Sequence, residues 1–377
     1  MKRIEPVVSK KQLKLFVDFP HNLYEHEPTY VPELFIAQKD LLTPGKHPFY
    51  ENAEMQLFLA YDGEKITGRI AAILNFNHNK FNNANDGFFG FFDCINDRET
   101  AGLLLDAAEK WLKEKGVTDK IMGPMNPSTN ETCGMLVDGF EKPPMVMMTH
   151  NASYYKDLVE QHGYTKQTDL MAYLYQTNDY NDARIRRLQA LAQKRLEHRN
   201  IVIRKVNMKD FSNEADKIKA VYNSAWDKNL GFYPMTDKEF KYTAKDLKMI
   251  LDPDFCIVAE HEGRIIGFAL ALPNINEVLI KIKRGRLFPT GLIKLLTGKS
   301  KVTSLRIIML GVIEGYRKSG IEMSFYTTII DEVLKRKRIR EVEASWVLED
   351  NILMNKAIQD INGVPYKRYR IFEKKML

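Results

Sequence analysis

The order of elements predicted for this chain repeats about 200 residues later, and this repeat constrains its fold more than any single motif. In the first half, an apolar run ends in a turn signal, Asp62-Gly63, and returns as a second strand-like run over 65–75. In the second half, the segments 255–260, 261–263 and 264–272 repeat that pattern. Each set predicts a β-hairpin. The repeat therefore favours two copies of one α+β unit.

A second pair of segments matches at the same offset. Asn151 precedes Gly163 by 12 residues, and Asn351 precedes Gly363 by 12. Residues 151–162 are expected to form a helix that Gly163 closes. At 377 residues the chain is long for one core, which also favours two domains. We expect the bounds to be 1–180 for the first domain, 181–200 for a linking helix and 201–377 for the second domain. The alternative is that two unrelated mixed domains share hairpins and helices by coincidence.

Composition is that of an ordinary globular protein, with a net charge of +7. The odd number of cysteines argues against a disulfide framework, and their spacing does not suggest a metal site, so we expect none. A reducing, cytoplasmic setting fits best. No apolar run approaches the roughly 18 residues of a membrane span, and the N-terminus does not resemble a signal peptide. The three cysteines are Cys94, Cys133 and Cys256.

The segment 304–336 predicts a strand, a basic turn and a helix in succession. A β-branched apolar run over 304–312 is typical of a strand, and apolar residues recur at helical spacing over 321–336. Between them, Arg317-Lys-Ser-Gly320 offers two cations, free backbone N–H groups and the positive end of a helix dipole. This turn is predicted to hold a phosphate-bearing ligand. The alternative is a solvated turn in which Gly320 satisfies only the backbone conformation.

The whole unit resembles the GNAT acyltransferase fold. In that family, Arg/Gln-x-x-Gly-x-Gly/Ala opens the central helix and cradles the pyrophosphate of coenzyme A. Here Arg317-Lys-Ser-Gly-Ile-Glu322 matches the arginine and the first glycine, but has Glu322 where a small residue is usual. Asn351 matches the family's asparagine, whereas Ile358 stands where a tyrosine acid is usual. The resemblance implies an α+β fold, an α/β/α sandwich with two tandem GNAT-like domains, each a mixed, mostly antiparallel sheet flanked by helices.

The chain is also similar to a poorly characterised bacterial subfamily of tandem GNAT proteins. The similar segments are 88–92, 123–126, 136–140, 222–226, 345–346 and 366–370. The first copy has no glycine before its helix, in Asn96-Asp-Arg-Glu-Thr100, so we expect its donor site to be degenerate. The resemblance places acetyl-CoA or a longer acyl-CoA in the second copy as co-substrate. The residues expected to bind it are Leu310, Gly311, Val312, Arg317, Lys318, Ser319, Gly320 and Asn351.

Acyl transfer to an amine requires a base, and the sequence leaves its identity open. Glu349 is the first candidate and Asp93 the second, although such residues are more often ordinary helix-capping or surface carboxylates. The acceptor is expected to meet an aromatic loop and a segment rich in side-chain amides, both of which also suit ordinary turns. The expected acceptor-binding residues are Trp226, Asn229, Phe232, Tyr233, Asn126, Asn130, His150 and Asn151.

The segment Lys281 to Lys301 is basic and locally apolar. It suits an acidic carrier protein, a membrane surface or phosphates, or alternatively a solvated helix that covers the core. The resemblance implies an N-acyltransferase that moves an acyl group from acyl-CoA, or from a carrier thioester, to an amine. Two alternatives remain open. One is an aminoacyl or acyl transferase with a donor on tRNA or acyl carrier protein, and the other is a ligand-binding protein whose acyl-CoA site has decayed.

Overall fold

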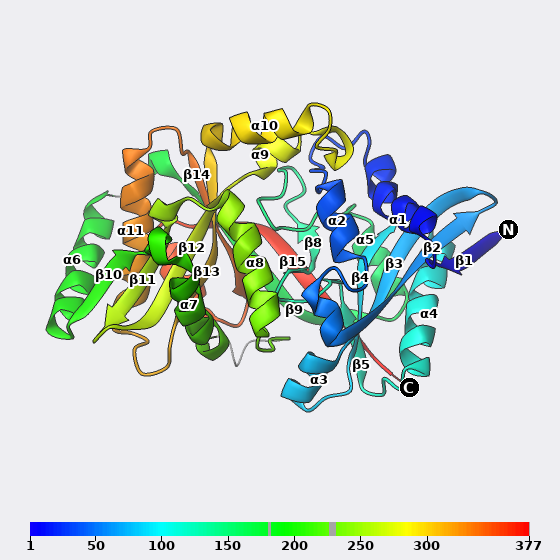
Figure 1. The fold of residues 1–377 in the computed structure, drawn as a ribbon, viewed down its shortest axis with the longest axis horizontal. Coiled ribbons are helices and arrows are strands. Elements are labelled where there is room, and N and C mark those ends of the chain that lie inside the picture. Colours follow the sequence, from blue (N-terminus) through cyan, green and yellow to red (C-terminus); the bar gives the residue numbers. More distant parts are fainter. Residues whose placement is uncertain (180–181, 226–230, 377) are drawn as a thin grey trace. The chain divides into compact units, whose positions relative to one another are not determined.

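The computed structural model describes residues 1–179, 182–225 and 231–376 (Figure 1). Contacts divide the chain into two compact units. The first unit comprises Met1–Leu170, Asn276–Leu296 and Lys367–Leu377, and the second comprises Met171–Ile275 and Thr297–Tyr366. The first unit therefore takes two segments from the second half of the sequence. We retain the two-domain organisation as a proposal, with these two segments assigned to the first domain rather than to 201–377.

The first unit is built on a sheet in which neighbouring strands are antiparallel except at one position. Strands β1, β2, β3 and β4 pair in sequence order, and β4 then pairs in parallel with β5. The end of β15 pairs with β5, and β8 pairs with β15. The strands are β1 (Lys2–Pro6), β2 (Ala53–Asp62), β3 (Lys65–Asn75), β4 (Gly87–Cys94), β5 (Lys120–Gly123), β8 (Met135–Asp138) and β15 (Val364–Lys375). A separate short hairpin joins β6 (Met125–Asn126) to β7 (Thr132–Cys133).

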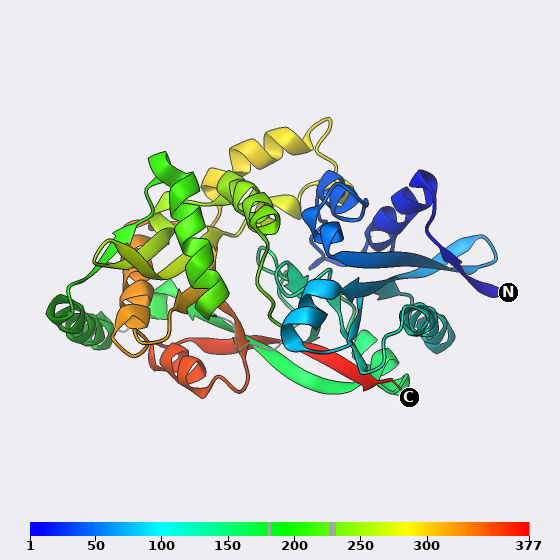
Figure 2. The same ribbon diagram turned by 60° about the horizontal axis from the view of Figure 1, so that its bottom comes forward.

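Helices cover both faces of this sheet, with α1 on one face and α4 on the other (Figure 2). The amphipathic helix α4 (Arg98–Glu114) buries Leu104, Leu105, Ala108 and Leu112, each with no exposed surface. Helix α1 (Lys10–Leu23) begins with a capping box between Ser9 and Gln12, which satisfies free N–H groups of its first turn. The other helices are α2 (Phe35–Leu41), α3 (Phe76–Asn82), α5 (Tyr155–Gln161), α9 (Asn276–Leu279) and most of α10 (Gly291–Gly298).

The second unit repeats the same order of pairing. Strands β10 to β13 are antiparallel neighbours, and β13 pairs in parallel with β14. The strands are β10 (Ile201–Lys205), β11 (Cys256–His261), β12 (Arg264–Pro273), β13 (Ser304–Val312) and β14 (Glu341–Leu348). The helices are α6 (Asp182–His198), α7 (Phe211–Ala225), α8 (Asp237–Ile250), α11 (Ile321–Lys335) and α12 (Ile352–Asp360). Strand β9 (Thr165–Gln176) is divided between the two units.

Irregularities in the strand ladders of the two units occur at matching places. The β2–β3 ladder shifts register between Ala60 and Tyr61, and the β11–β12 ladder shifts between Ala259 and Glu260. The next ladders also shift, between β3 and β4 at 69–71 and between β12 and β13 at 270–271. Such bulges are specific local features. Their recurrence about 200 residues apart supports the internal repeat.

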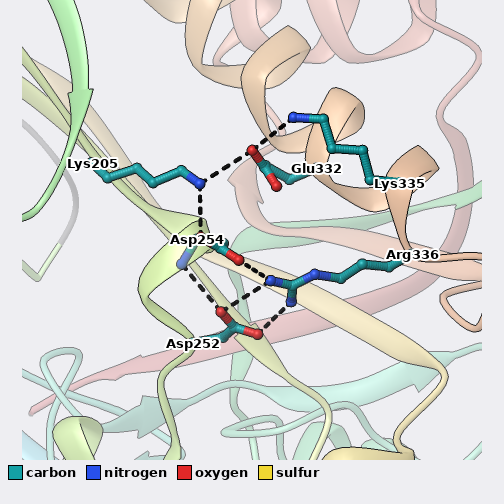
Figure 3. A network of polar contacts seen from close by, with 6 residues as sticks. All are labelled: Lys205, Asp252, Asp254, Glu332, Lys335 and Arg336. Carbon is teal, nitrogen blue, oxygen red and sulfur yellow. Dashed lines mark hydrogen bonds and ion pairs between the residues drawn. The ribbon is translucent and has the colours of Figure 1, made fainter.

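An ion-pair network ties together three elements of the second unit (Figure 3). Arg336, just after α11, pairs with both Asp252 and Asp254 before β11. The Lys205 ammonium on β10 lies 2.7 Å from an Asp254 carboxylate oxygen and 3.2 Å from one of Glu332 on α11. The hydrogen bond from Lys205 lowers the pKa of Asp254. The network fixes the C-terminal end of α11 against the edge of its sheet.

One local prediction needs correction. The helix expected from Asn151 to His162 is shorter, because α5 covers only Tyr155–Gln161. The sequence Asn151-Ala-Ser-Tyr154 instead remains irregular, since the Asn151 side chain is bonded to β8. Among the described residues, no helix has the length and apolarity needed to cross a bilayer.

Candidate functional site

Strands β13 and β14 separate part of the way along their length. Their parallel pairing covers four residues on each strand and ends where Ile307 meets Ala344. Strand β13 nevertheless continues to Val312, and β14 continues to Leu348. The ladder between β13 and β12 persists over this stretch and reaches Val312. The edge of β13 that faces β14 therefore has backbone groups beyond Ile307 that are not part of a ladder with β14.

All of the predicted donor residues except Asn351 lie at this separated end of β13 and in the turn that follows it. Arg317 and Lys318 are exposed, and Gly320 immediately precedes α11. The Arg317 guanidinium donates to the carbonyls of Val312, at 3.3 Å, and Ala225, at 3.1 Å. These bonds hold the cation beside the end of β13, next to the positive end of the α11 dipole. This geometry is that of a turn able to bind phosphate.

Gly320 also has a structural reason to be glycine. Its φ is +99°, a left-handed conformation that side chains disfavour. A Cβ at this position would lie 3.3 Å from the Cα of Ala192 in α6, so the helix approaches closely. Glu322 occupies the first turn of α11. Desolvation raises the pKa of the Tyr326 phenol, and the nearby charge of Glu322 raises it further, so this carboxylate lies within electrostatic reach of Tyr326.

In the first unit, the corresponding strand edge is occupied by the chain itself. The β4–β5 pairing ends where Phe88 meets Met122, but the edge of β4 is then covered by the β6 segment. The backbone N–H of Phe91 donates to the Asn126 carboxamide oxygen at 2.6 Å. A Cβ on Gly90 would lie only 1.6 Å from the carbonyl oxygen of Met125. Asn126, predicted to bind the acceptor, thus fills the space beside β4.

Two tyrosines complete the coverage of β4. The Tyr155 hydroxyl accepts from the backbone N–H of Cys94 at 2.8 Å, and the Tyr154 hydroxyl donates to the Cys94 carbonyl at 2.8 Å. Strand β4 has no counterpart of the basic glycine turn, because Asp97 caps α4 directly through the N–H of Thr100. The first unit therefore lacks both the uncovered strand edge and the basic glycine turn that lie next to each other in the second unit.

Asp93, the second candidate base, lies at the centre of a buried network. Its carboxylate accepts from the Tyr24 hydroxyl at 2.8 Å and from the Tyr155 hydroxyl at 3.3 Å. Arg69 donates to the other carboxylate oxygen through Nε at 2.8 Å and donates through Nη1 to the Phe16 carbonyl at 3.0 Å. Burial raises the pKa of the Asp93 carboxyl, while Arg69 and Tyr24 act in the opposite direction. The network joins α1, β3, β4 and α5.

His150 lies beside the same network. Its ring centroid is 5.1 Å from that of Tyr24 and 5.6 Å from that of Tyr30. Burial lowers the pKa of the His150 imidazole to about 4, so the ring is neutral at pH 7. Two residues that the sequence singled out for different roles, Asp93 and His150, thus flank one tyrosine, Tyr24.

The second unit buries a charged network of its own, between β13 and β14, that sequence reasoning missed. Arg306 on β13 and Glu343 on β14 are 3% and 0% exposed and lie opposite each other, one residue pair before the ladder between these strands ends. The Arg306 Nε donates to the Ser345 hydroxyl at 2.8 Å, and both Ser345 and Tyr366 donate to the Glu343 carboxylate. The available signal was a charged residue within each apolar strand, Arg306 in 304–312 and Glu343 in 341–348.

Glu349 and Asn351 lie beyond the end of β14. Both are exposed, and the Asn351 side chain accepts from the N–H of Met354, which caps α12. Asn355 reinforces this turn by donating to the carbonyls of Leu348 and Glu349. Their proposed roles in binding and catalysis remain predictions.

The remaining acceptor residues are dispersed. Trp226 and Asn229 lie outside the described residues. Phe232 and Tyr233 are 5% and 1% exposed, within the core of the second unit. Asn130 lies in the turn between β6 and β7, where its N–H donates to the Ser128 hydroxyl. Asn151 is 6% exposed and bonds both backbone groups of Leu136. That these residues together bind the acceptor remains a prediction.

One group of potential metal ligands occurs in the described residues, although we expected no metal site. Asp106, Glu109 and His162 place ligand atoms within 4.8 Å of one another. The Lys374 ammonium, however, lies 2.8 Å from a Glu109 oxygen. This cation supplies the charge compensation that the acidic side chain needs.

Two proteins share about a third of their residues with this chain over nearly its full length. Bacterial ceramide synthase from Caulobacter vibrioides is 35% identical over 378 residues, which cover 98% of this chain and 96% of that protein. Protein YghO from Escherichia coli K12 is 34% identical over 379 residues, covering 99% and 95% of the two chains. No family model matches the chain.

Solved structures share the fold at low sequence identity. A tandem GNAT protein from the clavulanic acid biosynthesis pathway has a TM-score of 0.58 at 10% identity, with 100% of this chain and 98% of that chain covered. A probable N-acyltransferase from Enterococcus faecalis has a TM-score of 0.52 at 11% identity, covering 100% and 73%. The chain therefore belongs to the family that contains Caulobacter bacterial ceramide synthase and protein YghO, and it has the fold of the tandem GNAT acyltransferases.

Proposed function

We propose that this protein is an N-acyltransferase that binds an acyl-CoA in its second unit. The observation that carries the proposal is the separation of β13 from β14 directly before the Arg317–Gly320 turn. A thioester lying along β13 would meet backbone groups of Leu310, Gly311 and Val312, and its phosphates would meet the turn. Because the first unit covers the matching edge with Asn126, we assign only one donor site to the chain.

The reaction proposed is direct attack of an amine on the thioester. The amine nitrogen forms a bond to the thioester carbon, and the carbon–sulfur bond then breaks to release a thiolate. Backbone N–H groups of β13 would stabilise the oxyanion of the tetrahedral intermediate. The proton lost by the amine must reach a base and finally the thiolate. Glu349, which is exposed at the end of β14, is our first choice for that base.

The acceptor we propose is a long-chain amino alcohol. The Caulobacter relative is a ceramide synthase, and a ceramide is by definition the amide of a long-chain amino alcohol with a fatty acid. The amine attacks directly in this scheme, so no acyl-enzyme and no cysteine nucleophile is required. All three cysteines are buried, which keeps them from a substrate. Desolvation also raises the pKa of the Cys94 and Cys256 thiols, so these two are poor nucleophiles.

Titration calorimetry with acetyl-CoA and palmitoyl-CoA tests the donor site. Arg317→Ala should weaken acyl-CoA binding by roughly tenfold to a hundredfold, as expected when a charge-assisted bond to phosphate is lost. Arg338→Ala is the matched control, since Arg338 is also exposed in the second unit but lies beyond the far end of α11. Arg338→Ala should leave the affinity unchanged.

Turnover is tested by incubating the protein with palmitoyl-CoA and sphinganine, then measuring the amide by mass spectrometry and the free thiol by a colorimetric reagent. Both products should appear in equal amounts. If no acyl-CoA binds, the coenzyme A assignment is wrong. If the amide forms from an acylated acyl carrier protein but not from acyl-CoA, the donor is a carrier thioester rather than acyl-CoA.

A further inference from the structure

The segment 276–296 leaves the second half of the sequence to pack within the first unit. Arg286 pairs with Asp18 of α1 at 2.8 Å, and Arg284 pairs with the same carboxylate at 3.2 Å. The Asn276 carboxamide donates to the carbonyls of Pro144 and Met145, both at 2.9 Å. These contacts fix the base of the segment firmly to the body of its unit.

Close packing reinforces these polar contacts. A Cβ on Gly285 would lie 1.8 Å from the carbonyl oxygen of Glu33, so this backbone touches the start of α2. The Arg286 guanidinium lies 3.3 Å from the centroid of the Phe35 ring. The segment is therefore a fixed part of the first unit rather than a loosely attached loop.

The tip of the segment exposes large apolar side chains. Phe288 is 78% exposed, Ile293 63% and Leu296 71%. Ile293 and Leu296 are three residues apart in α10 and share one face of that helix. Three such side chains within nine residues form a concentrated apolar surface rather than the scattered exposure that is normal for soluble proteins. α10 is drawn in yellow in Figure 1.

Positive charge accompanies this surface. The sequence from Val278 to Lys301 contains no aspartate or glutamate. Arg284 and Arg286 pair with Asp18. Lys281, Lys283 and Lys294 are exposed and close in sequence to the apolar residues, and the Lys294 ammonium also donates to the Lys281 carbonyl at 2.8 Å. An anchored element that presents aromatic and aliphatic tips together with lysines suits the interface of an anionic bilayer, where apolar groups enter the acyl boundary and cations meet lipid headgroups.

We propose that the 288–296 surface docks this protein onto anionic membranes. A bilayer accepts protruding Phe, Ile and Leu side chains without a matching pocket, whereas a folded carrier protein would need one. The lysines supply an attraction that depends on lipid charge and falls with salt. This inference stands on the segment's own geometry and does not require that the chain be an acyltransferase.

Vesicle sedimentation provides the first test. The wild-type protein should bind vesicles of phosphatidylglycerol and phosphatidylcholine and bind pure phosphatidylcholine much less, with binding reduced as salt rises. The variant F288S/I293S/L296S should lose at least about tenfold in partitioning, because three apolar contacts with the acyl boundary are removed. The matched control is M249S/I352S/L353S, which changes side chains that are 67%, 74% and 69% exposed in the second unit. It should bind as wild type does.

A site-specific probe makes the test independent of overall affinity. Phe288→Trp should show a blue shift and an increase in emission when anionic vesicles are added, whereas Ile352→Trp should not. K281Q/K283Q should weaken binding and flatten its dependence on salt. The proposal is overturned if the triple variant binds vesicles as the wild type does. It is also overturned if the Phe288→Trp signal responds to acyl carrier protein and not to lipid.

Discussion

Strands β4 and β13 hold the same place in the two units, yet their edges have different surroundings. Both strands form a parallel ladder with the next strand that ends early, after Phe88 in one unit and after Ile307 in the other. Beyond that point, β4 is covered by Asn126, Tyr154 and Tyr155. Strand β13 instead leads to a basic turn and the N-terminus of α11.

The comparison shows that the same architecture can either cover a strand edge with its own side chains or leave that edge available to a ligand. A strand edge exposes backbone donors and acceptors that require partners. In the first unit, side chains of the same unit provide those partners, so the edge contributes to stability. In the second unit, we propose that an acyl thioester provides them. Both units also bury an arginine–carboxylate pair, although at different places: Arg69 and Asp93 lie between β3 and β4, and Arg306 and Glu343 lie between β13 and β14.

The largest effect is expected from removing one partner of these buried pairs. Asp93→Ala should lower the free energy of unfolding by about 3–5 kcal/mol, because Arg69 would remain buried without its counter-ion. Glu343→Ala should cost a similar amount by stranding Arg306. Chemical denaturation measures the loss, and amide hydrogen exchange shows which unit opens.

Conservative variants sharpen this test. Asp93→Asn keeps the size and some of the hydrogen bonds, and should cost less than Asp93→Ala. If Asp93→Ala costs under 1 kcal/mol, Arg69 must find other partners, and the buried pair of the first unit does not contribute to stability as expected. Exchange that rises only in the second unit after Asp93→Ala would contradict the assignment of this pair to the first.

A smaller loss is expected from uncovering the edge of β4. Asn126→Ala removes the acceptor of the Phe91 N–H and should lower the free energy of unfolding by about 1–3 kcal/mol. Hydrogen exchange at the Phe91 amide should speed up, while exchange at β13 should stay the same. Asn178→Ala, which changes an exposed asparagine, is the control and should leave exchange in both units unaltered. An unchanged Phe91 amide would show that Asn126 does not seal this edge.

A pH dependence of stability is also expected in the first unit, where three histidines are buried. Burial lowers the pKa values of His21, His47 and His150 to about 4. Between pH 6.5 and 4 the unfolded histidines bind protons that the folded ones do not, so acidification destabilises the first unit across this window. Each histidine contributes at most about 1.4 kcal/mol per pH unit. Above pH 6.5 these histidines are neutral in both states, and the protein retains its full stability with respect to them.

Carboxylates titrate in the same pH range, so the contribution of one histidine is obtained as the difference between the wild type and a variant that lacks it. His150→Gln should flatten the dependence of the free energy of unfolding on pH relative to wild type, as measured by denaturant titration from pH 4 to 7.5. A steeper or identical slope in His150→Gln would be incompatible with a neutral, buried His150.

Much of the fold was predictable from local patterns. The hairpin with the Asp62-Gly63 turn follows from short-range turn chemistry, and β2 and β3 flank that turn as expected. The resemblance to the GNAT fold rested on the order of elements in the repeated unit and on the Arg317–Gly320 motif, and the solved tandem GNAT structure confirms that fold. The α5 boundary was predicted wrongly, because the Asn151 side chain bonds to β8 instead of starting a helix. That competition involves residues on two different elements, which no local pattern records.

The candidate site was predictable to a lesser degree. The sequence located the basic turn and suggested that the copy near Asn96 lacked one. It could not reveal that Arg306 and Glu343 face each other, since their contact depends on the register of β13 and β14. Nor could it reveal that segment 276–296 packs within the first unit, because that depends on Asp18 and Pro144, more than 100 residues earlier.

The sequence by itself determined the repeated α+β order, the position of the Arg317–Gly320 turn and the positive, apolar character of the segment around α10. These features are set by residues that are near neighbours in the chain. The tertiary structure alone decided which strand edge is covered and which pairs of charges are buried. It also decided that Phe288, Ile293 and Leu296 face solvent. Such outcomes depend on side chains from distant segments competing for the same backbone groups and the same apolar contacts.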